Sequence, residues 1–221
     1  MSGKLWKQAW ENDQIDFHQA APNPLLQRYW PGLLLAPGAN VFVPLCGKSH
    51  DMAWLLSQNC RVTGIELSPI AVAAFFRESG LSPSQTRQGR LTRWHCERLD
   101  IYCGDIFDLP RSALADIAAV YDRAALLAFG PVMRQRYVRH LRAILPVVSP
   151  ILLLTTGYPE DAEAGEPPFV IDAEIHALYD ADFHIELLHA ERGFETHPGQ
   201  GHVGLSRTEE KAHLLRARSG R

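Results

Sequence analysis

The chain has 221 residues, of which 46% are hydrophobic and 21% are charged, and its formal net charge is −3 at pH 7. This length and composition predict one soluble globular domain over residues 1–221, burying roughly 70% of its unfolded surface without disulfides. The small net charge and the lack of a Lys- or Arg-rich block argue against a nucleic-acid partner. No apolar run approaches the roughly 18 residues of a membrane span.

Cysteine and histidine spacing argues against a metal site. The four cysteines form no C-x-x-C pair, and the ten histidines are scattered without an H-x-x-x-H pair, which favours structural or solvent-facing roles. The N-terminal stretch MSGKLWKQAWEND carries charges and no apolar run, so a signal peptide is not expected. We therefore expect a cytoplasmic protein with reduced thiols, and we further expect it to be a monomer.

The first thirty residues predict two short amphipathic helices. One helical face carries Leu5, Trp6, Ala9 and Trp10, and a second amphipathic segment runs from Asn23 to about Tyr29. Aromatic side chains at helical spacing are usually packing residues, so the pattern alone is compatible with simple cover for the core.

The stretch from Val41 to Glu66 predicts a βαβ unit, the arrangement of parallel strands joined by a helix. Its predicted parts are a strand over 41–43, a turn over 44–48, a helix over 49–58 and a strand over 61–65. Such units bind ligands at the carboxyl ends of their strands. Glu66 ends the second strand, where a carboxylate can hold the hydroxyl groups of a ribose.

The rest of the chain predicts continued alternation of helices and strands. Ser68 and Pro69 are typical of the N-cap and first position of a helix that ends at Gly80, and residues 81–90 are predicted to be a polar loop. The other predicted elements are strands over 91–95, 98–103, 117–121 and 151–156, helices over 132–145 and 172–179, a loop over 159–168, and antiparallel closing strands over 183–189 and 212–216 joined by a loop over 193–204. This order predicts an α/β doubly wound fold.

The turn after the first strand excludes two phosphate-binding motifs. Gly47-Lys48-Ser49 matches the end of a P-loop, but that motif requires glycine where this chain has Phe42. A dinucleotide-binding turn needs three glycines, and this turn has one, with Pro44 and Leu45 where the backbone would approach a pyrophosphate. A cofactor with a ribose and an adenine but no phosphate remains, and S-adenosylmethionine meets that description.

Residues at predicted strand ends could hold such a cofactor. Glu66 would bind the ribose, the turn with Gly47 would receive the methionine end, and Asp105-Ile106 would lie near the adenine. Arg123 is the best-placed cation for a carboxylate or a polarised substrate atom. The structural alternatives are a surface carboxylate at Glu66 and an ion pair of Asp122-Arg123 at a helix start.

Eight stretches in chain order also carry a resemblance to a known family. They are WKQAWENDQIDFH (6–18), NPLLQRYWP (23–31), VFVPLCGKSHDMAWL (41–55), GIELSPIAVAAFF (64–76), CGDIFDL (103–109), YDRAALLAF (121–129), MRQRYVRHL (133–141) and PPF (167–169). Together they resemble bacterial members of the thiopurine S-methyltransferase family, which includes enzymes that methylate selenium and tellurium species. The P-L-C-G-K-S turn is quite specific to that family.

The resemblance implies a Rossmann-like methyltransferase fold with S-adenosylmethionine as donor, in which residues 1–32 form a lid over a core of residues 33–221. Carried over by position, it implies cofactor contacts at Trp10, Leu45, Glu66 and Arg123, an adenine-side position at Asp105 and Ile106, and a substrate-pocket aromatic at Phe17. Arg123 would also be catalytic, by stabilising an anionic acceptor.

The implied reaction is methyl transfer to a thiopurine-type, aromatic or heterocyclic thiol, with selenium or tellurium anions as the alternative acceptors. Two departures from the family bear on the acceptor: residues 195–202 read ETHPGQGH without the second arginine common there, and Thr155 to Tyr158 replace a Leu-acid-Tyr pattern. Two rival classes remain from the sequence, a nicotinamide oxidoreductase and a non-catalytic binding module of the same fold.

Overall fold

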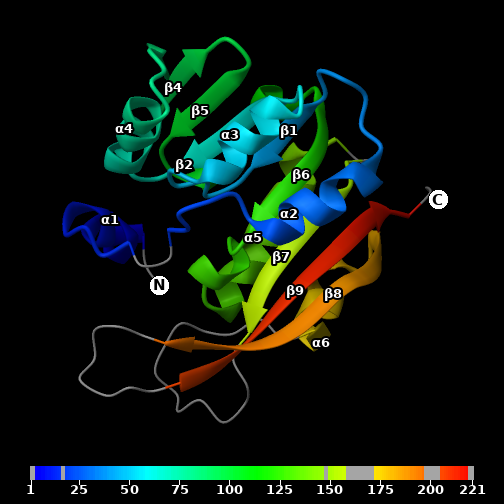
Figure 1. Cartoon of the computed structure of the whole chain (residues 1–221). Helices are drawn as coiled ribbons and strands as arrows, with labels where there is room; N and C mark the ends of the chain where they lie inside the picture. Colours follow the sequence, from blue (N-terminus) through cyan, green and yellow to red (C-terminus); the bar gives the residue numbers. More distant parts are fainter. Residues whose placement is uncertain (1–2, 16–17, 147–148, 158–171, 197–204, 219–221) are drawn as a thin grey trace.

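The computed structural model describes residues 3–15, 18–146, 149–157, 172–196 and 205–218 (Figure 1). Its strands are β1 (Asn40–Val43), β2 (Arg61–Glu66), β3 (Ser84–Gln88), β4 (Leu91–Cys96), β5 (Leu99–Cys103), β6 (Ile117–Arg123), β7 (Ile151–Gly157), β8 (Phe183–Thr196) and β9 (Leu205–Ala217). Its α-helices are α1 (Gly3–Glu11), α2 (Pro24–Tyr29), α3 (His50–Ser57), α4 (Pro69–Glu78), α5 (Pro131–Ile144) and α6 (Asp172–Tyr179). Short 3-10 helices are η1 (Trp30–Leu33), η2 (Ile106–Asp108), η3 (Arg111–Leu114) and η4 (Leu126–Ala128).

The described strands form one nine-stranded sheet in the order β3-β4-β5-β2-β1-β6-β7-β9-β8. The central strands β5, β2, β1, β6 and β7 are parallel, while β4 and β9 join them antiparallel. From β1 the chain proceeds to β2 on one side and later to β6 on the other, so the strand order reverses at β1. In sheets of this kind, ligands bind beyond the carboxyl ends of the strands at that reversal.

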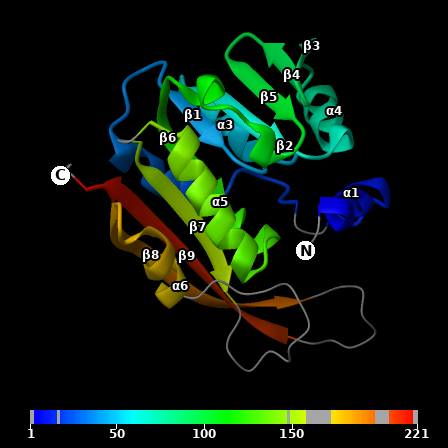
Figure 2. The same ribbon diagram turned by 180° about the vertical axis from the view of Figure 1, so that it is seen from behind.

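Helices cover both faces of the sheet because the parallel strands are apolar on both sides. Val41 and Val43 pack with residues of α2, α3 and α4, whereas Phe42, between them in sequence, packs with residues of α5 and α6. Figure 1 shows α2 and α3 on the near face, and Figure 2 shows α5 on the other. The expected doubly wound α/β fold is confirmed.

Strand register places two polar side chains beside the same turn. Val43, the last residue of β1, pairs with Gly64, so Glu66 extends two residues beyond it. On the other side of β1, Phe42 pairs with Val120, three residues before Arg123. Both Glu66 and Arg123 therefore flank the turn that leaves β1.

Most predicted elements are confirmed, and two predictions need correction. The predicted polar loop over 81–90 is wrong, because residues 84–88 form β3, which pairs antiparallel with β4. All five of its residues are exposed, so this edge strand has none of the apolar alternation that identifies a strand in a sequence. The closing strands β8 and β9 also extend further than predicted. The loop predicted over 159–168 lies outside the described residues, as do residues 197–204 of the other predicted loop.

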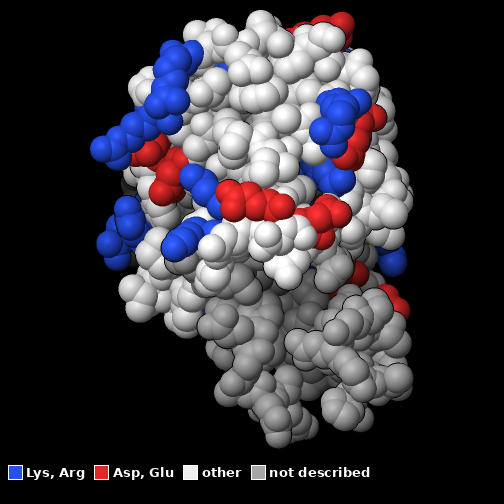
Figure 3. Space-filling view, turned by 90° about the vertical axis from the view of Figure 1, so that its left-hand side faces the viewer, with Lys and Arg blue, Asp and Glu red and all other residues white. Residues whose placement is uncertain are grey.

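The N-terminal helix lies beside the carboxyl ends of the strands (Figure 1). On the side of the molecule that carries α1, basic and acidic side chains are interspersed rather than separated by sign (Figure 3). None of the described helices has the length and apolar character needed to cross a membrane.

Candidate functional site

The turn between β1 and α3 has an unusual backbone. Leu45 and Gly47 have positive φ angles of 47° and 53°, a left-handed conformation that costs a residue with a side chain about 1–2 kcal/mol. The Cys46 N–H donates to the Ile65 carbonyl at 3.0 Å, which fixes the turn against β2. Non-glycine residues held in this conformation cluster at functional sites, and Leu45 and Gly47 are two of the residues predicted to bind cofactor.

Glu66 is a buried carboxylate aimed at this turn. Its Oε2 accepts a hydrogen bond from the Gly47 N–H at 2.9 Å, and its Oε1 accepts one from the Ser68 N–H at 2.7 Å. Burial raises the pKa of Glu66, while hydrogen bonds from Ser68, Gly47 and Leu67 act in the opposite direction. The interpretation of Glu66 as a surface carboxylate is wrong, since only 7% of the residue is exposed. Each oxygen can accept a further hydrogen bond.

Arg123 lies on the other side of the turn and forms an ion pair that the sequence did not reveal. Its Nε lies 2.8 Å from Oδ2 of Asp51, and its Nη2 donates to Oγ of Ser49 at 3.3 Å. Asp51 is in the first turn of α3 and is almost completely buried. An acidic residue is common in the first turn of a helix, so the sequence gives no sign that Asp51 has a special role. Its burial in the structure is what sets it apart.

Asp122 points to the opposite face of the sheet from Arg123. Its carboxylate accepts hydrogen bonds from Oη of Tyr137 at 2.7 Å and from the Ala125 N–H at 3.3 Å. The alternative interpretation, an ion pair between Asp122 and Arg123, is therefore wrong. Arg123 pairs with Asp51 instead. Burial raises the pKa of Asp122 to about 6.

The predicted adenine-side residues follow β5, the strand beside β2. Asp105 is exposed and accepts a hydrogen bond from the Phe107 N–H at 3.0 Å, while Ile106 is buried and its carbonyl lies 2.8 Å from Nε2 of His140. The Gly104 N–H donates to the Glu66 carbonyl at 2.8 Å. Asp105 directly follows Gly104, and the backbone hydrogen bond of Gly104 to Glu66 places Asp105 close to the end of β2.

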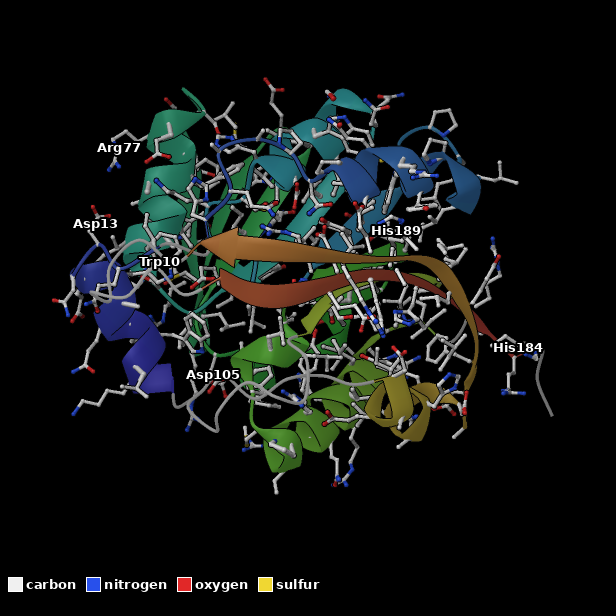
Figure 4. The ribbon with its side chains drawn as sticks, turned by 60° about the horizontal axis from the view of Figure 1, so that its bottom comes forward. Trp10, Asp13, Arg77, Asp105, His184 and His189 are labelled. Atoms are coloured by element: carbon white, nitrogen blue, oxygen red, sulfur yellow. The ribbon has the colours of Figure 1, made fainter. Side chains whose placement is uncertain are left out.

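The helix α1 brings Trp10 onto the turn. A Cβ atom placed on Gly47 would lie 3.3 Å from Cζ2 of Trp10, so the indole packs against the bare glycine. Trp6 Nε1 donates to the Ala128 carbonyl at 3.2 Å, which attaches α1 to the segment after β6. Figure 4 shows Trp10 and Asp105 at the same end of the molecule, with His184 at the other. Phe17, the predicted substrate-pocket aromatic, lies outside the described residues.

Two histidines that look unrelated in the sequence also meet near the turn. The ring centroids of His18 and His50 are 5.3 Å apart. Burial lowers the pKa of His18, and the nearby charges of Lys48, His50 and Arg123 lower it further, with Glu78 opposing them. The imidazole of His18 is therefore less readily protonated than a free one.

Other features of the described chain do not compete with this site. A cavity of about 1050 Å³ lies at the amino end of β7, with Leu141, Tyr179 and Phe183 in its lining. It is at the wrong end of the parallel strands for a ribose-binding carboxylate. No group of three or more His, Cys, Asp or Glu side chains among the described residues could hold a metal ion.

Comparison with known proteins matches this chain to one family. The family model described as thiopurine S-methyltransferase matches residues 1–218. A thiopurine S-methyltransferase from Nitrosospira multiformis is 46% identical over 220 residues, covering 99% of this chain and 100% of that protein. One from Stutzerimonas stutzeri is 47% identical over 213 residues, covering 95% and 88% respectively.

Two solved structures with a similar fold are methyltransferases. A SAM-dependent methyltransferase from Anabaena variabilis has a TM-score of 0.65 at 14% identity and covers 98% of this chain and 95% of its own. The 1,6-didemethyltoxoflavin-N1-methyltransferase of Burkholderia thailandensis, solved with bound S-adenosylhomocysteine, has a TM-score of 0.66 at 16% identity, with coverage of 98% and 87%.

Proposed function

We propose, because this chain belongs to the thiopurine S-methyltransferase family, that it methylates the sulfur of a thiopurine-type, aromatic or heterocyclic thiol. By family and fold it is an S-adenosylmethionine-dependent methyltransferase. The observation that carries the assignment of residues is that Glu66 and Arg123 flank one turn, which Trp10 covers.

The residues around the turn fit the cofactor. Glu66 presents two carboxylate oxygens at a strand end, so we assign it the ribose hydroxyls. Leu45 and Gly47 are partly exposed, and the indole of Trp10 packs against Gly47; we assign Leu45, Gly47 and Trp10 to the methionine end. Asp105 and Ile106, beside the strand end of β5, are assigned to the adenine. S-Adenosylmethionine, when bound, supplies an electrophilic methyl group carried by a sulfonium.

The protein's contribution would then be alignment and exclusion of water. A heteroaromatic thiol is acidic enough to be largely ionised near neutral pH, so no dedicated general base is required. Arg123 can donate hydrogen bonds to an anionic acceptor, and α1 with Trp10 can shield the site from solvent. Orientation of the two reactants would supply most of the acceleration.

The acceptor class is tested by a labelled-methyl transfer assay with thiopurines, aliphatic thiols, selenite and tellurite. We expect transfer to the heterocyclic thiols to be the fastest. Preferred transfer to the selenium or tellurium species would contradict the thiol assignment and support the alternative. Binding of S-adenosylhomocysteine without transfer to any acceptor would identify a non-catalytic module.

Replacing Arg123 with lysine tests the role of its guanidinium. An ammonium keeps the positive charge beside Asp51 but lacks the planar fork, so we expect kcat/KM for the thiol to fall about 100-fold. Alanine is less informative, because it would leave Asp51 buried and unpaired. The matched control is Arg142→Lys, which alters an Arg–Asp pair of 2.6 Å with Asp182 at the other end of the sheet. Equal activities of the two variants would refute the role.

A further inference from the structure

Asp51 is a buried carboxylate on which two separate parts of the chain converge, the segment before α2 and the strand β6. Its Oδ1 accepts a hydrogen bond from the Asn23 N–H at 2.7 Å. Its Oδ2 accepts one from Oη of Tyr121 at 2.9 Å and lies 2.8 Å from Nε of Arg123. The Asp51 side chain is 1% exposed. A buried carboxylate is costly unless its oxygens are satisfied, and here both oxygens have donors.

These contacts hold the Arg123 guanidinium at two points. Asp51 binds Nε, and Oγ of Ser49 accepts a hydrogen bond from Nη2 at 3.3 Å. Because the guanidinium is a rigid plane, two anchors on different nitrogens fix its orientation about the side-chain axis. The anchors themselves are fixed, since Ser49 is the N-cap of α3 and its Oγ also accepts the Asp51 N–H at 3.2 Å. The group is thus oriented before any ligand arrives.

The same carboxylate also fastens the end of the N-terminal segment. Asn23 donates its backbone N–H to Asp51, while its side-chain Oδ1 caps α2 by accepting the Leu25 N–H at 2.8 Å. Its Nδ2 donates to Glu210 on β9 at 3.2 Å. Asp51 therefore anchors both the guanidinium of Arg123 and the residue, Asn23, at which the N-terminal segment joins the core.

We propose that Asp51, together with Ser49, is a positioning residue that holds Arg123 in the orientation in which it meets the methyl acceptor. This inference rests on the proposed role of Arg123. The Asp51 side chain is almost completely buried and pairs with Arg123, so its removal should act through the arginine. The effect should therefore appear in the methyl-transfer step and in the handling of the acceptor, rather than in cofactor affinity.

The principal test is Asp51→Asn. An amide keeps the size of the group and one acceptor oxygen, but it cannot pair ionically with Arg123. Misorientation of a catalytic group by about 1 Å can cost 100-fold, so we expect kcat/KM for the thiol to fall about 10- to 100-fold. Affinity for S-adenosylhomocysteine by calorimetry should stay within about threefold, because the change spares Trp10, Leu45 and Glu66 and leaves only the contact expected of Arg123 to be weakened. An unchanged kcat/KM would overturn the proposal, as would a loss of transfer fully explained by lost cofactor affinity.

The matched control is Asp182→Asn, which breaks the exposed Arg142–Asp182 pair and should leave kcat/KM within about twofold. A second comparison is Tyr121→Phe, which removes one donor to Asp51 but retains the ion pair. If Asp51 only stabilised the fold through its hydrogen bonds, each of the two variants, Tyr121→Phe and Asp51→Asn, would lose methyl-transfer activity in proportion to its loss of thermal stability. The proposal instead requires a much larger kinetic loss for Asp51→Asn at a comparable loss of stability.

A double-mutant cycle separates failure of this inference from failure of the proposed function. If Asp51 acts through Arg123, adding Asp51→Asn to Arg123→Lys should lower kcat/KM by less than about threefold further, because coupled residues have non-additive effects. Fully multiplicative losses would overturn the proposal. Normal transfer by Arg123→Lys alone would instead refute the role of Arg123.

Ser49→Gly provides a variant that should fold even if Asp51→Asn does not, because glycine is nearly as good as serine at a helix N-cap. It removes the second anchor of Arg123 and should lower kcat/KM about 3- to 10-fold, the value of one hydrogen bond. Unchanged transfer by this variant would exclude two-point positioning.

Discussion

At the scale of single residues, burial changes what each carboxylate in this region can do. Glu66, Asp51 and Asp122 are all buried, yet their donors differ. Within the described part of the chain, the donors to Glu66 are backbone N–H groups, so its oxygens retain acceptor capacity toward a ligand. Asp51 has an ionic partner in Arg123, whereas the donors to Asp122 among the described residues are the Tyr137 hydroxyl and the Ala125 N–H. The three acids therefore suit ligand binding, positioning and core packing respectively.

Glu66→Gln tests the first of these roles. Loss of charge-assisted hydrogen bonds, each worth about 1.5–3 kcal/mol, should weaken S-adenosylhomocysteine binding at least tenfold in calorimetry at pH 7.5. Hydroxyl donors favour the ionised carboxylate, and burial raises the pKa of Glu66. Affinity of the unmodified protein should therefore weaken as pH falls through that raised pKa, and the glutamine variant should lack this dependence. Exposed Glu186→Gln is the control; a weakening equal to that of Glu66→Gln would contradict the assignment.

At the scale of elements, the site depends on a turn and a helix that fit together without a side chain between them. The helix α1 crosses the strand ends because Trp6 is attached near Ala128 and Trp10 packs on Gly47. A Cβ atom at position 47 would lie 3.3 Å from the indole, so the ring would have to shift to make room for it. The N-terminal helix can thus cover the turn only as long as the turn keeps its shape at Gly47.

Gly47→Ala tests whether the packing of Trp10 on the turn matters for stability and for cofactor binding. The alanine would have an unfavourable φ of 53° and a Cβ 3.3 Å from Trp10, so we expect a stability loss of about 1–2 kcal/mol together with weaker S-adenosylhomocysteine binding. Gly89→Ala is the matched control, because Gly89 has a φ of 59° with nothing within 4 Å of an added Cβ. It should lose similar stability in urea unfolding but bind normally. Normal binding by Gly47→Ala would show that the indole contact is dispensable.

At the scale of the whole molecule, the sheet separates the Arg123 side chain on one face of β6 from a buried acid, Asp122, on the other face. Burial raises the pKa of Asp122 from 3.8 to about 6. The folded protein therefore holds this proton more tightly than the unfolded chain does. Its contribution to stability is complete below about pH 4 and is lost as pH rises through about 6. The loss corresponds to about 3 kcal/mol, an upper limit for a fully buried group.

Asp122→Asn should remove this dependence. The amide can keep hydrogen bonds with Tyr137 and Ala125 without burying a charge, so the variant should be about 1–3 kcal/mol more stable than the unmodified protein at pH 7.5. The advantage should vanish by pH 4 in urea unfolding measured across that range. Asp116→Asn is a control of opposite sign: burial raises the pKa of Asp116, but hydrogen bonds from Asn40 and Arg61 lower it overall. An advantage for Asp122→Asn that is constant with pH would refute the explanation.

The sequence by itself determined the features that depend on near neighbours. The helix starts at Ser49 and Ser68 were predictable because an N-cap and the residues it serves lie within three positions. The buried strands β1, β2, β6 and β7 were predictable from short apolar runs. The position of Glu66 at the end of such a run was sufficient to predict a ligand-binding edge.

Only the tertiary structure decided which distant residues meet. Asp51 and Arg123 are 72 positions apart, and Trp10 and Gly47 are 37 apart; neither pair has a local pattern, because the contacts arise from strand register and from the path of the N-terminal segment. The exposed strand β3 was missed for a related reason, since its backbone bonds to β4 while its polar side chains carry no periodicity. Local hydrogen bonding and apolar patterning thus specified where the elements lie. The register of the assembled sheet determined which partners complete the site.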